Sequence, residues 1–279
     1  MKLDFITVVY DREVDLLQWQ AKSFSKYIDP EIINRIIVVD NGSQTCSKDI
    51  KKTWYGDLKE KVKIINHKDL DLMVFEWLDG WRTQQICKIL AATQSTTEWS
   101  LILDAKTFFA KTLNINELFD KDRPCVGYVG VSEHWTDSKK YLEDFYKIKI
   151  PFVLGPGGVP FFFHTETVKA LVNEIPNFNN WFQELLYERT PPHRLLITEF
   201  MLYSAFVLKK FNAFEKLYSD EKKITTFNIS AWELLDDFDK FEQIFYANSH
   251  AISIDGRAKK LLNKEQLQKW EKFLHDKYN

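Results

Sequence analysis

TEWSLILDAKTFF, residues 97–109, is the stretch that decides the fold of this chain. Its apolar run over residues 99–103 predicts a short buried strand, which stops at the carboxylate of Asp104. The preceding segment GWRTQQICKILAA, residues 80–92, predicts a helix with Ile86 and Ile89 at core spacing. A carboxylate at the carboxyl end of a strand in an open α/β sheet lies where such folds bind ligands. Asp104 is therefore the first candidate site residue.

The segments around this stretch alternate between strands and helices. Apolar, β-branched runs at residues 5–10, 35–40 and 62–66 predict three further strands. A helix is predicted from about residue 11 to residue 27, and a less regular region precedes the strand at 62–66. This alternation predicts a Rossmann-like open sheet, mostly parallel and flanked by helices. Further strands are predicted at 125–131, 223–229 and 250–254, and a glycine-rich loop enters an aromatic strand within 151–164. Further helices are predicted near 138–148, 165–173, 180–188, 196–209 and 264–277.

Length and composition limit the classes of protein that this chain can represent. The 279 residues favour one domain over residues 1–255, with a C-terminal helix within 256–279 packed on it. The 38 basic and 40 acidic residues give a net charge of -2, which argues against a nucleic-acid partner bound through bulk positive charge. Three widely spaced cysteines suggest neither a disulfide framework nor a zinc site.

No signal peptide or apolar run of about 18 residues is visible in the sequence. We therefore expect a cytoplasmic protein with no transmembrane segment. Peripheral contact with the inner face of a membrane stays open, as does the oligomeric state.

The order of several short motifs resembles that of GT-A-type glycosyltransferases, in particular the bacterial capsule and lipopolysaccharide-type family. That family carries a GW..QQ..K helix before a DxD-like strand end. The motifs that carry the resemblance here are TVVY at 7–10, VVDNGS at 38–43, GW..QQ..K at 80–88, LDAK at 103–106 and TEFMLY at 198–203. The resemblance spans residues 3–255 and implies an enzyme that transfers a sugar from a nucleotide-sugar donor to a glycan or other hydroxyl acceptor, in surface polysaccharide synthesis.

The resemblance also implies roles for individual residues. Val9, Tyr10 and Asp40 would contact the base and ribose of the donor. The helix residues Gln84, Gln85 and Lys88 adjoin the Asp104 strand and are further donor-binding candidates. Asp104 would lie near the diphosphate, and Glu199 would accept the acceptor's proton in a direct, inverting displacement, with a retaining route left open.

One position departs from the family pattern. Lys106 stands where the second DxD aspartate is expected, and a protonated lysine cannot ligate magnesium or manganese. We therefore doubt that a divalent metal is used and expect the Lys106 ammonium to stabilise the charge on the leaving diphosphate. If a metal is used, Asp104 and His250 are its candidate ligands.

The acceptor-side candidates are Gly157 and Gly158 in the glycine-rich loop, together with His164. Each candidate also has a purely structural interpretation: Asp40 as a turn residue, Glu199 as a helix-capping residue, the helix amides as a solvated face, and the histidines as core or surface residues.

Two other functions compete with sugar transfer. Lys106 is compatible with a catalytically impaired protein that binds a nucleotide-sugar or glycan without turnover. A nucleotidyltransferase on a similar sheet would need a glycine-rich basic loop directly after the first strand, and Tyr10-Asp11-Arg12-Glu13 is not such a loop.

Overall fold

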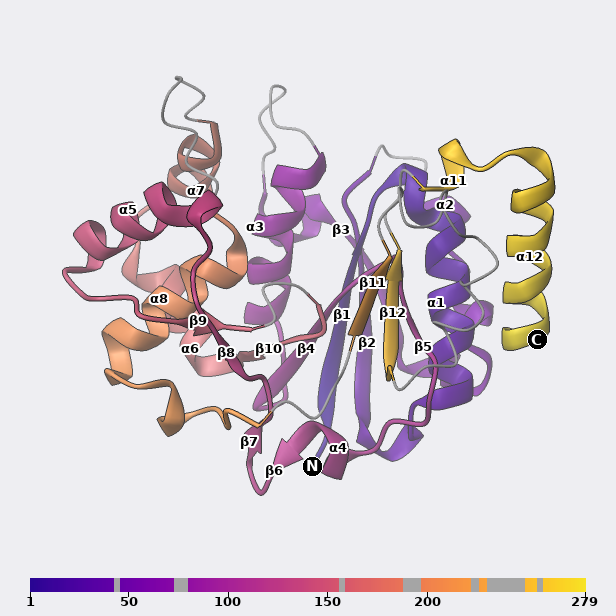
Figure 1. Ribbon diagram of the computed structural model, residues 1–279, viewed down its shortest axis with the longest axis horizontal. Helices are drawn as coiled ribbons and strands as arrows, with labels where there is room; N and C mark the ends of the chain where they lie inside the picture. Colours follow the sequence, from indigo (N-terminus) through magenta and orange to yellow (C-terminus); the bar gives the residue numbers. More distant parts are fainter. Residues whose placement is uncertain are drawn as a thin grey trace.

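A computed structural model of the chain describes residues 1–42, 46–72, 80–155, 159–187, 197–221, 226–229, 249–254 and 258–279. Its centre is a five-stranded sheet with the order β10-β4-β1-β2-β3 (Figure 1). The strands are β1 (Leu3–Val9), β2 (Ile33–Asp40), β3 (Val62–Asn66), β4 (Trp99–Asp104) and β10 (Phe161–His164). The first four are parallel and β10 is antiparallel to β4. The expected α/β class with a mostly parallel sheet is confirmed.

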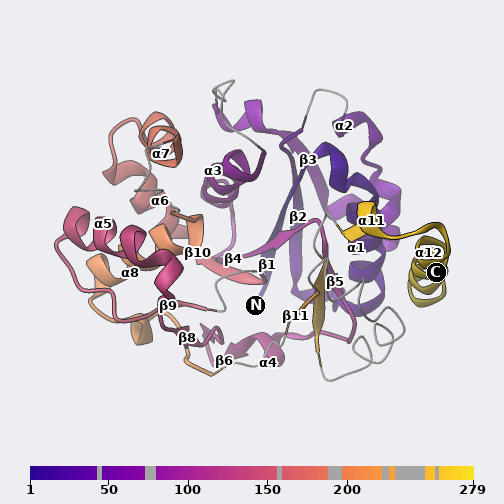
Figure 2. The ribbon, with the colours of Figure 1, turned by 45° about the horizontal axis from the view of Figure 1, so that its top comes forward.

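Helices cover both faces of this sheet. Figure 2 shows α1 (Val14–Tyr27) on one face and α3 (Gly80–Thr93) on the other. All seven residues of β1 are buried as a result, which explains why its sequence is a nearly continuous apolar run. Leu17 and Phe24 of α1 and Ile86 and Ile89 of α3 are fully buried against the strands.

The strand order reverses at β1. The strands β2 and β3 follow on one side of it, and β4 and β10 follow on the other. The register places Asp104 beside Val8 and Asp40 beside Val9, so the carboxyl ends of these strands meet at one edge. Ligands of open α/β sheets bind outside this edge at such a reversal point.

A second, three-stranded sheet has the order β11-β12-β5 and lies beside α1 and the C-terminal helix α12 (Figure 1). Its strands are β5 (Thr107–Phe109), β11 (Thr226–Ile229) and β12 (Ala251–Ile254), and the helices after it are α11 (Ala258–Leu261) and α12 (Lys264–Tyr278). Trp270, Phe273 and Tyr278 of α12 join an apolar cluster with Phe108 and Leu16. The Tyr278 hydroxyl donates to the Phe109 carbonyl at 3.1 Å. The predicted C-terminal helix is therefore present and anchored to the chain that precedes it.

Most of the remaining helices gather on the far side of β10 (Figure 1). They are α5 (Thr136–Tyr146), α6 (Thr165–Glu174), α7 (Phe178–Tyr187) and α8 (Glu199–Phe211). The shorter elements are α2 (Cys46–Asp49), α4 (Ile115–Leu118), β6 (Phe119–Asp120), β7 (Arg123–Pro124), β8 (Tyr128–Val129) and β9 (Val153–Leu154), with 3₁₀ helices at Asp11–Glu13, Pro30–Ile32, Lys52–Lys61, His67–Leu70, Glu133–Trp135 and Phe214–Lys216. The strand predicted over 125–131 is reduced to β8, because Gly127 takes a positive φ of 69° that interrupts extended backbone.

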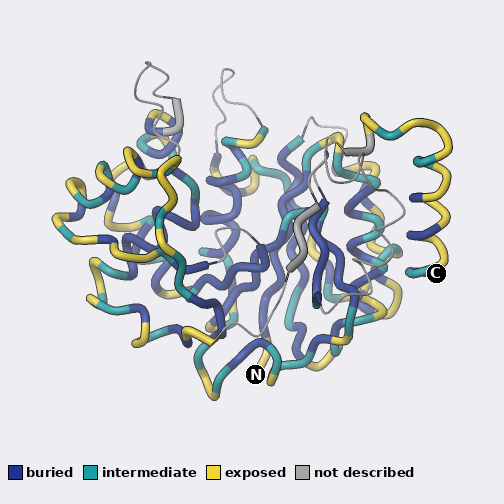
Figure 3. Tube along the Cα trace, viewed as in Figure 1, coloured by how far each residue is buried: buried dark blue, intermediate teal, exposed yellow. Residues whose placement is uncertain are grey.

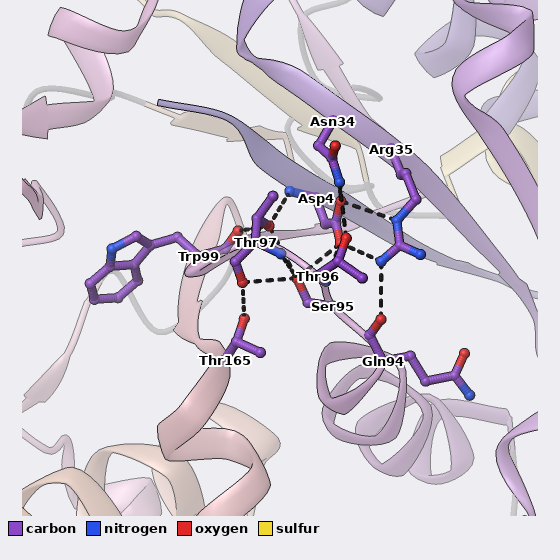
Figure 4. Close-up of polar contacts among 9 residues, drawn as sticks. All are labelled: Asp4, Asn34, Arg35, Gln94, Ser95, Thr96, Thr97, Trp99 and Thr165. Carbon is purple, nitrogen blue, oxygen red and sulfur yellow. Dashed lines mark hydrogen bonds and ion pairs between the residues drawn. The ribbon is translucent and has the colours of Figure 1, made fainter.

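A buried polar network closes the opposite, amino-terminal edge of the sheet (Figure 4). The Asp4 carboxylate accepts hydrogen bonds from Arg35 at 2.6 Å, Asn34 at 2.8 Å, the Ser95 hydroxyl at 2.9 Å and the Thr96 amide at 3.0 Å. Burial alone would raise the pKa of Asp4, but these hydrogen bonds outweigh it and lower that pKa. The network ties β1 to β2 and to the turn between α3 and β4.

Burial is deepest in the central strands and in α3, whereas α12 has buried residues only along one side (Figure 3). Among the helices that the structure describes, none combines the length and the apolar character needed to cross a membrane.

Candidate functional site

Lys88 of α3 is a buried lysine that contacts two carboxylates. Its ammonium lies 2.7 Å from Asp104 Oδ1 and 2.8 Å from Glu199 Oε1. The lysine and the glutamate are 2% and 1% exposed, so both are withdrawn from water. The nearness of these atoms makes the contacts ion pairs, and the Phe200 ring packs against the same ammonium at 5.1 Å. Helix α3, strand β4 and helix α8 thus meet at one buried charge cluster.

Asp104 ends β4, and the turn that follows it brings Lys106 back toward the carboxylate. The Lys106 ammonium lies 3.7 Å from Asp104 Oδ2, and its side chain is 28% exposed. The cluster therefore has one buried cation, Lys88, and one cation with access to solvent, Lys106.

Gln20 of α1 fixes the turn that carries Asp104 and Lys106. Its side-chain amide donates to the carbonyl oxygens of Asp104 at 2.6 Å and Thr107 at 2.9 Å. Its own oxygen accepts from the Thr7 hydroxyl at 2.9 Å, so these three hydrogen bonds of the fully buried amide join β1, β4 and β5.

Glu199 is the first residue of α8, and Thr198 caps that helix by accepting from the Met201 amide at 3.2 Å. The Glu199 backbone amide donates to Gln85 Oε1 at 3.3 Å, and Gln85 Nε2 donates to the Trp81 carbonyl at 3.0 Å. Among the described residues, Glu199 Oε2 has no hydrogen-bond donor. One oxygen of this carboxylate thus pairs with Lys88 and the other is left for a further donor.

The surroundings shift the pKa values of the cluster in different directions. Burial would lower the pKa of Lys88, but Asp104 and Glu199 outweigh it and raise that pKa. Burial would raise the pKa of Asp104, but Lys88 and Lys106 outweigh it and lower that pKa. Burial raises the pKa of Glu199 because Lys88 offsets it only in part. The cluster therefore holds Asp104 ionised, and Glu199 is the carboxyl group that takes up a proton more readily.

Glu13 lies near the same cluster, at the end of the 3₁₀ helix Asp11–Glu13 that follows β1. Burial raises the pKa of its carboxyl, and Lys106, Asp104 and Lys88 all act on it electrostatically. Glu13 was not among the residues predicted from the sequence.

The donor set does not fit a divalent cation. Each oxygen of Asp104 faces a lysine ammonium, and an ammonium cannot be a metal ligand. In the part of the chain that the structure describes, no three His, Cys, Asp or Glu side chains gather as metal ligands.

The donor-side candidates lie at the same sheet edge. Asp40 is fully buried; its oxygens accept from the Gly42 amide at 2.8 Å and from Asn66 Nδ2 at 3.3 Å. Val9 is buried beside it, and half-buried Tyr10 follows Val9. The Tyr10 ring packs so closely on Gly80 that a Cβ atom there would lie 2.9 Å from the ring. Gly80 is therefore needed for the close approach of α3 to the end of β1.

The remaining candidates have different outcomes. Gln84 is half-exposed on α3, while Gln85 is buried against Glu199. His164 pairs with Trp99 at the start of β4, so the structure places it at the opposite end of that strand from Asp104. His250 lies beside Glu117 and Ala110, whereas Lys106 is near Ile254 at the other end of β12, so His250 is not brought to Asp104. Gly157 and Gly158 lie outside the described residues.

The family model of DUF6492, described as a family of unknown function, matches residues 3–251. The chain belongs to this family. None of the curated proteins matches this DUF6492 chain.

Among solved structures, the DUF6492 chain is similar to the galactosyltransferase LgtC in complex with donor and acceptor sugar analogues. The identity is 10%, the match covers 98% of this chain and 96% of that one, and the TM-score is 0.52. The match to an active-site mutant of LgtC has 11% identity, covers 97% of this chain and 96% of that one, and has a TM-score of 0.50. The match to apo mouse xyloside xylosyltransferase 1 has 14% identity, covers 91% of this chain and 97% of that one, and has a TM-score of 0.44. At these identities the likeness to LgtC shows the fold alone, and the expected GT-A fold of the DUF6492 chain is confirmed.

Proposed function

We propose that this DUF6492 chain is a glycosyltransferase that moves a sugar from a nucleotide-sugar donor to a hydroxyl of a glycan acceptor, in surface polysaccharide synthesis. The observation that carries the proposal is the Lys88 ammonium held between Asp104 and Glu199. These residues come from three distant segments and meet where the strand order reverses, which is the ligand edge of this class of sheet. Clusters of carboxyl groups with shifted pKa values in such positions are typical of active sites.

The donor is placed across the ends of β2, β1 and β4. Asp40, Val9 and Tyr10 would contact the nucleoside, and the diphosphate would reach the solvent-accessible ammonium of Lys106. We assign Lys88 a positioning role rather than the donor contact expected from the sequence, because both of its short ion pairs are to protein carboxylates. Gln85 has a similar role toward the backbone of Glu199.

The reaction is a direct displacement at the anomeric carbon. The bond from that carbon to the diphosphate oxygen breaks with its electron pair leaving on the nucleoside diphosphate, and a new bond forms to the acceptor oxygen. The acceptor hydroxyl gives its proton to Glu199 Oε2, the oxygen not paired with Lys88. This oxygen is buried, so acceptor binding must expose it for this step. Lys106 stabilises the negative charge that grows on the leaving group. The anomeric configuration is inverted, which NMR of the product would test.

A metal has no step in this scheme, because Asp104 is paired with two ammonium groups. Lys106 supplies the positive charge at the diphosphate that a divalent cation would otherwise supply.

The test is a screen of the purified chain against a panel of nucleotide-sugars with glycan acceptors, separating the nucleotide products by ion-exchange chromatography. We expect the parent chain to release a nucleoside diphosphate. We expect the isosteric variant Glu199→Gln to lose this release and to keep donor binding. Nucleotide binding with no turnover would instead support a binding protein. Pyrophosphate formed from a nucleoside triphosphate and a sugar phosphate would support a nucleotidyltransferase.

A further inference from the structure

A pocket of about 310 Å³ lies beside the start of α8, next to the strands β8 and β9. Its lining comes from three segments that are adjacent in Figures 1 and 2. The lining residues fall within 129–135, 153–154 and 198–201, and Gly130 is one of them. A volume of this size is at the lower end of the range for small-molecule sites.

The chemistry of the lining selects an apolar ligand. None of the described lining residues is charged, and Ser132 and Thr198 supply the only hydroxyl groups among them. Aliphatic and aromatic side chains form the rest, and half-buried Trp135 offers a flat ring of the kind that binds sugar rings and aryl groups. A nucleotide or a sugar phosphate would leave its charge unpaired in this pocket.

The walls of the pocket are fixed by hydrogen bonds. The Leu154 amide donates to the Ser204 hydroxyl of α8 at 3.1 Å, and β9 pairs with β8 through Leu154 and Tyr128. Phe200 stacks on Phe161 of β10 with ring centroids 4.3 Å apart. The pocket is thus part of the fold and not a gap between loose side chains.

Phe200 and Thr198 connect the pocket to the charge cluster, because they flank Glu199 in the sequence. The Phe200 ring lines the pocket and also packs against the Lys88 ammonium. A molecule seated in the pocket therefore lies next to the segment that carries the proposed base.

We infer that this pocket binds the apolar aglycone of the acceptor, an alkyl or aryl group attached to the sugar whose hydroxyl receives the transferred residue. This inference rests on the proposed glycosyltransferase function for the word acceptor. The binding claim rests on the size of the pocket and on its uncharged, mostly apolar lining.

Binding of glycosides to the full chain tests the inference without any donor. Isothermal titration compares octyl β-D-glucopyranoside below its micelle concentration, phenyl β-D-glucopyranoside and methyl β-D-glucopyranoside. We expect the octyl or the phenyl glucoside to bind at least about tenfold more tightly than the methyl glucoside, since burying two methylene groups is enough for that ratio. A preference for octyl identifies an alkyl aglycone, and a preference for phenyl identifies an aryl one. Equal binding of all three would overturn the inference.

Gly130 is a lining residue of the pocket at which a larger side chain can be added without a clash at its Cβ atom. A Cβ atom on Gly130 would meet no atom within 4 Å, and its φ is not in the left-handed region. Gly130→Phe is expected to abolish the preference while leaving the circular dichroism spectrum and the Tm unchanged, and Gly130→Ser is the matched control that keeps it. An unchanged preference in Gly130→Phe would place the glycoside elsewhere and refute the assignment.

Donor turnover in the same proteins separates the two claims. Nucleoside diphosphate release without any aglycone preference refutes the pocket and leaves the proposed function standing. In the other outcome, the chain turns over no donor and still shows an aglycone preference that Gly130→Phe removes. That result supports glycoside binding in the pocket and refutes a role of the pocket in sugar transfer.

Discussion

Replacing Lys88 by methionine is the perturbation whose consequence the structure defines most clearly. The variant keeps most of the length of the side chain but leaves buried Glu199 and half-buried Asp104 without their shared counter-ion. Removing one partner of a buried ion pair costs about 3–5 kcal/mol, against a total stability of about 5–15 kcal/mol for a typical domain. Because Glu199 can protonate and Lys106 remains 3.7 Å from Asp104, we expect the lower end, about 3 kcal/mol, at pH 7.

The pH dependence gives this prediction a sign. In Lys88→Met the carboxyl pKa values rise in the folded state, so the folded state binds protons that the unfolded state does not. Its stability relative to the parent chain therefore falls as the pH rises from the ordinary carboxyl range through the raised pKa values. Urea unfolding at pH 5 and pH 8 would measure this, with Gln84→Met, a half-exposed position on the same helix, as the control. Equal stability of Lys88→Met and the parent chain at pH 8 would refute the account of the cluster.

Three further predictions concern the two edges of the sheet. Lys106→Ala is expected to lower turnover by about 10²–10³-fold with the circular dichroism spectrum unchanged, and wild-type-like turnover would contradict its role at the diphosphate. Asp4→Asn should cost about 2–4 kcal/mol in urea unfolding at pH 7 through weaker bonds to Arg35. Because the pKa of Asp4 is lowered in the folded state, its contribution to the free energy of unfolding is present above the unfolded pKa and is lost as the pH falls through the folded pKa. A cost of Asp4→Asn that is as large at pH 3 as at pH 7 would contradict this. Gly80→Ala pushes against the Tyr10 ring at 2.9 Å and should weaken nucleotide binding measured by titration, whereas unchanged affinity would place the nucleoside away from Tyr10.

Much of the fold could be predicted because its signals are local. The buried strands of the central sheet are apolar runs, and the carboxyl ends of parallel strands meet at one edge whatever the loops between them do. That rule was sufficient to predict from the sequence that Asp104 and Asp40 lie at one edge of the sheet. Lys88 of α3 and Glu199, the first residue of α8, were also named from the sequence. The burial of the lysine ammonium and its pairing with two carboxylates were not predicted.

Strand direction limited the rest of the prediction. His164 lies at the far end of the sheet because β10 runs antiparallel to β4, and His250 lies away from Lys106 because β12 runs antiparallel to β5. An apolar run has no feature that fixes its direction, so neither placement could be derived from the sequence.

Two residues of the site, Gln20 and Glu13, were not predicted from the sequence. Gln20 stands at core spacing between Leu16, Leu17 and Phe24 in the apolar stripe of α1, and a polar residue there signals a buried hydrogen-bonding role. Glu13 has the weaker signal of closely following a strand that ends at the ligand edge.

The central claim is sugar transfer at a site where Lys106, not a metal, faces the diphosphate. The most direct measurement is the rate of nucleoside diphosphate release from the accepted donor, in EDTA and with added manganese, for the parent chain and Lys106→Ala. We expect equal release rates for the parent chain under both conditions and a much lower release rate for Lys106→Ala. Release that requires manganese, or that persists in Lys106→Ala, would contradict it.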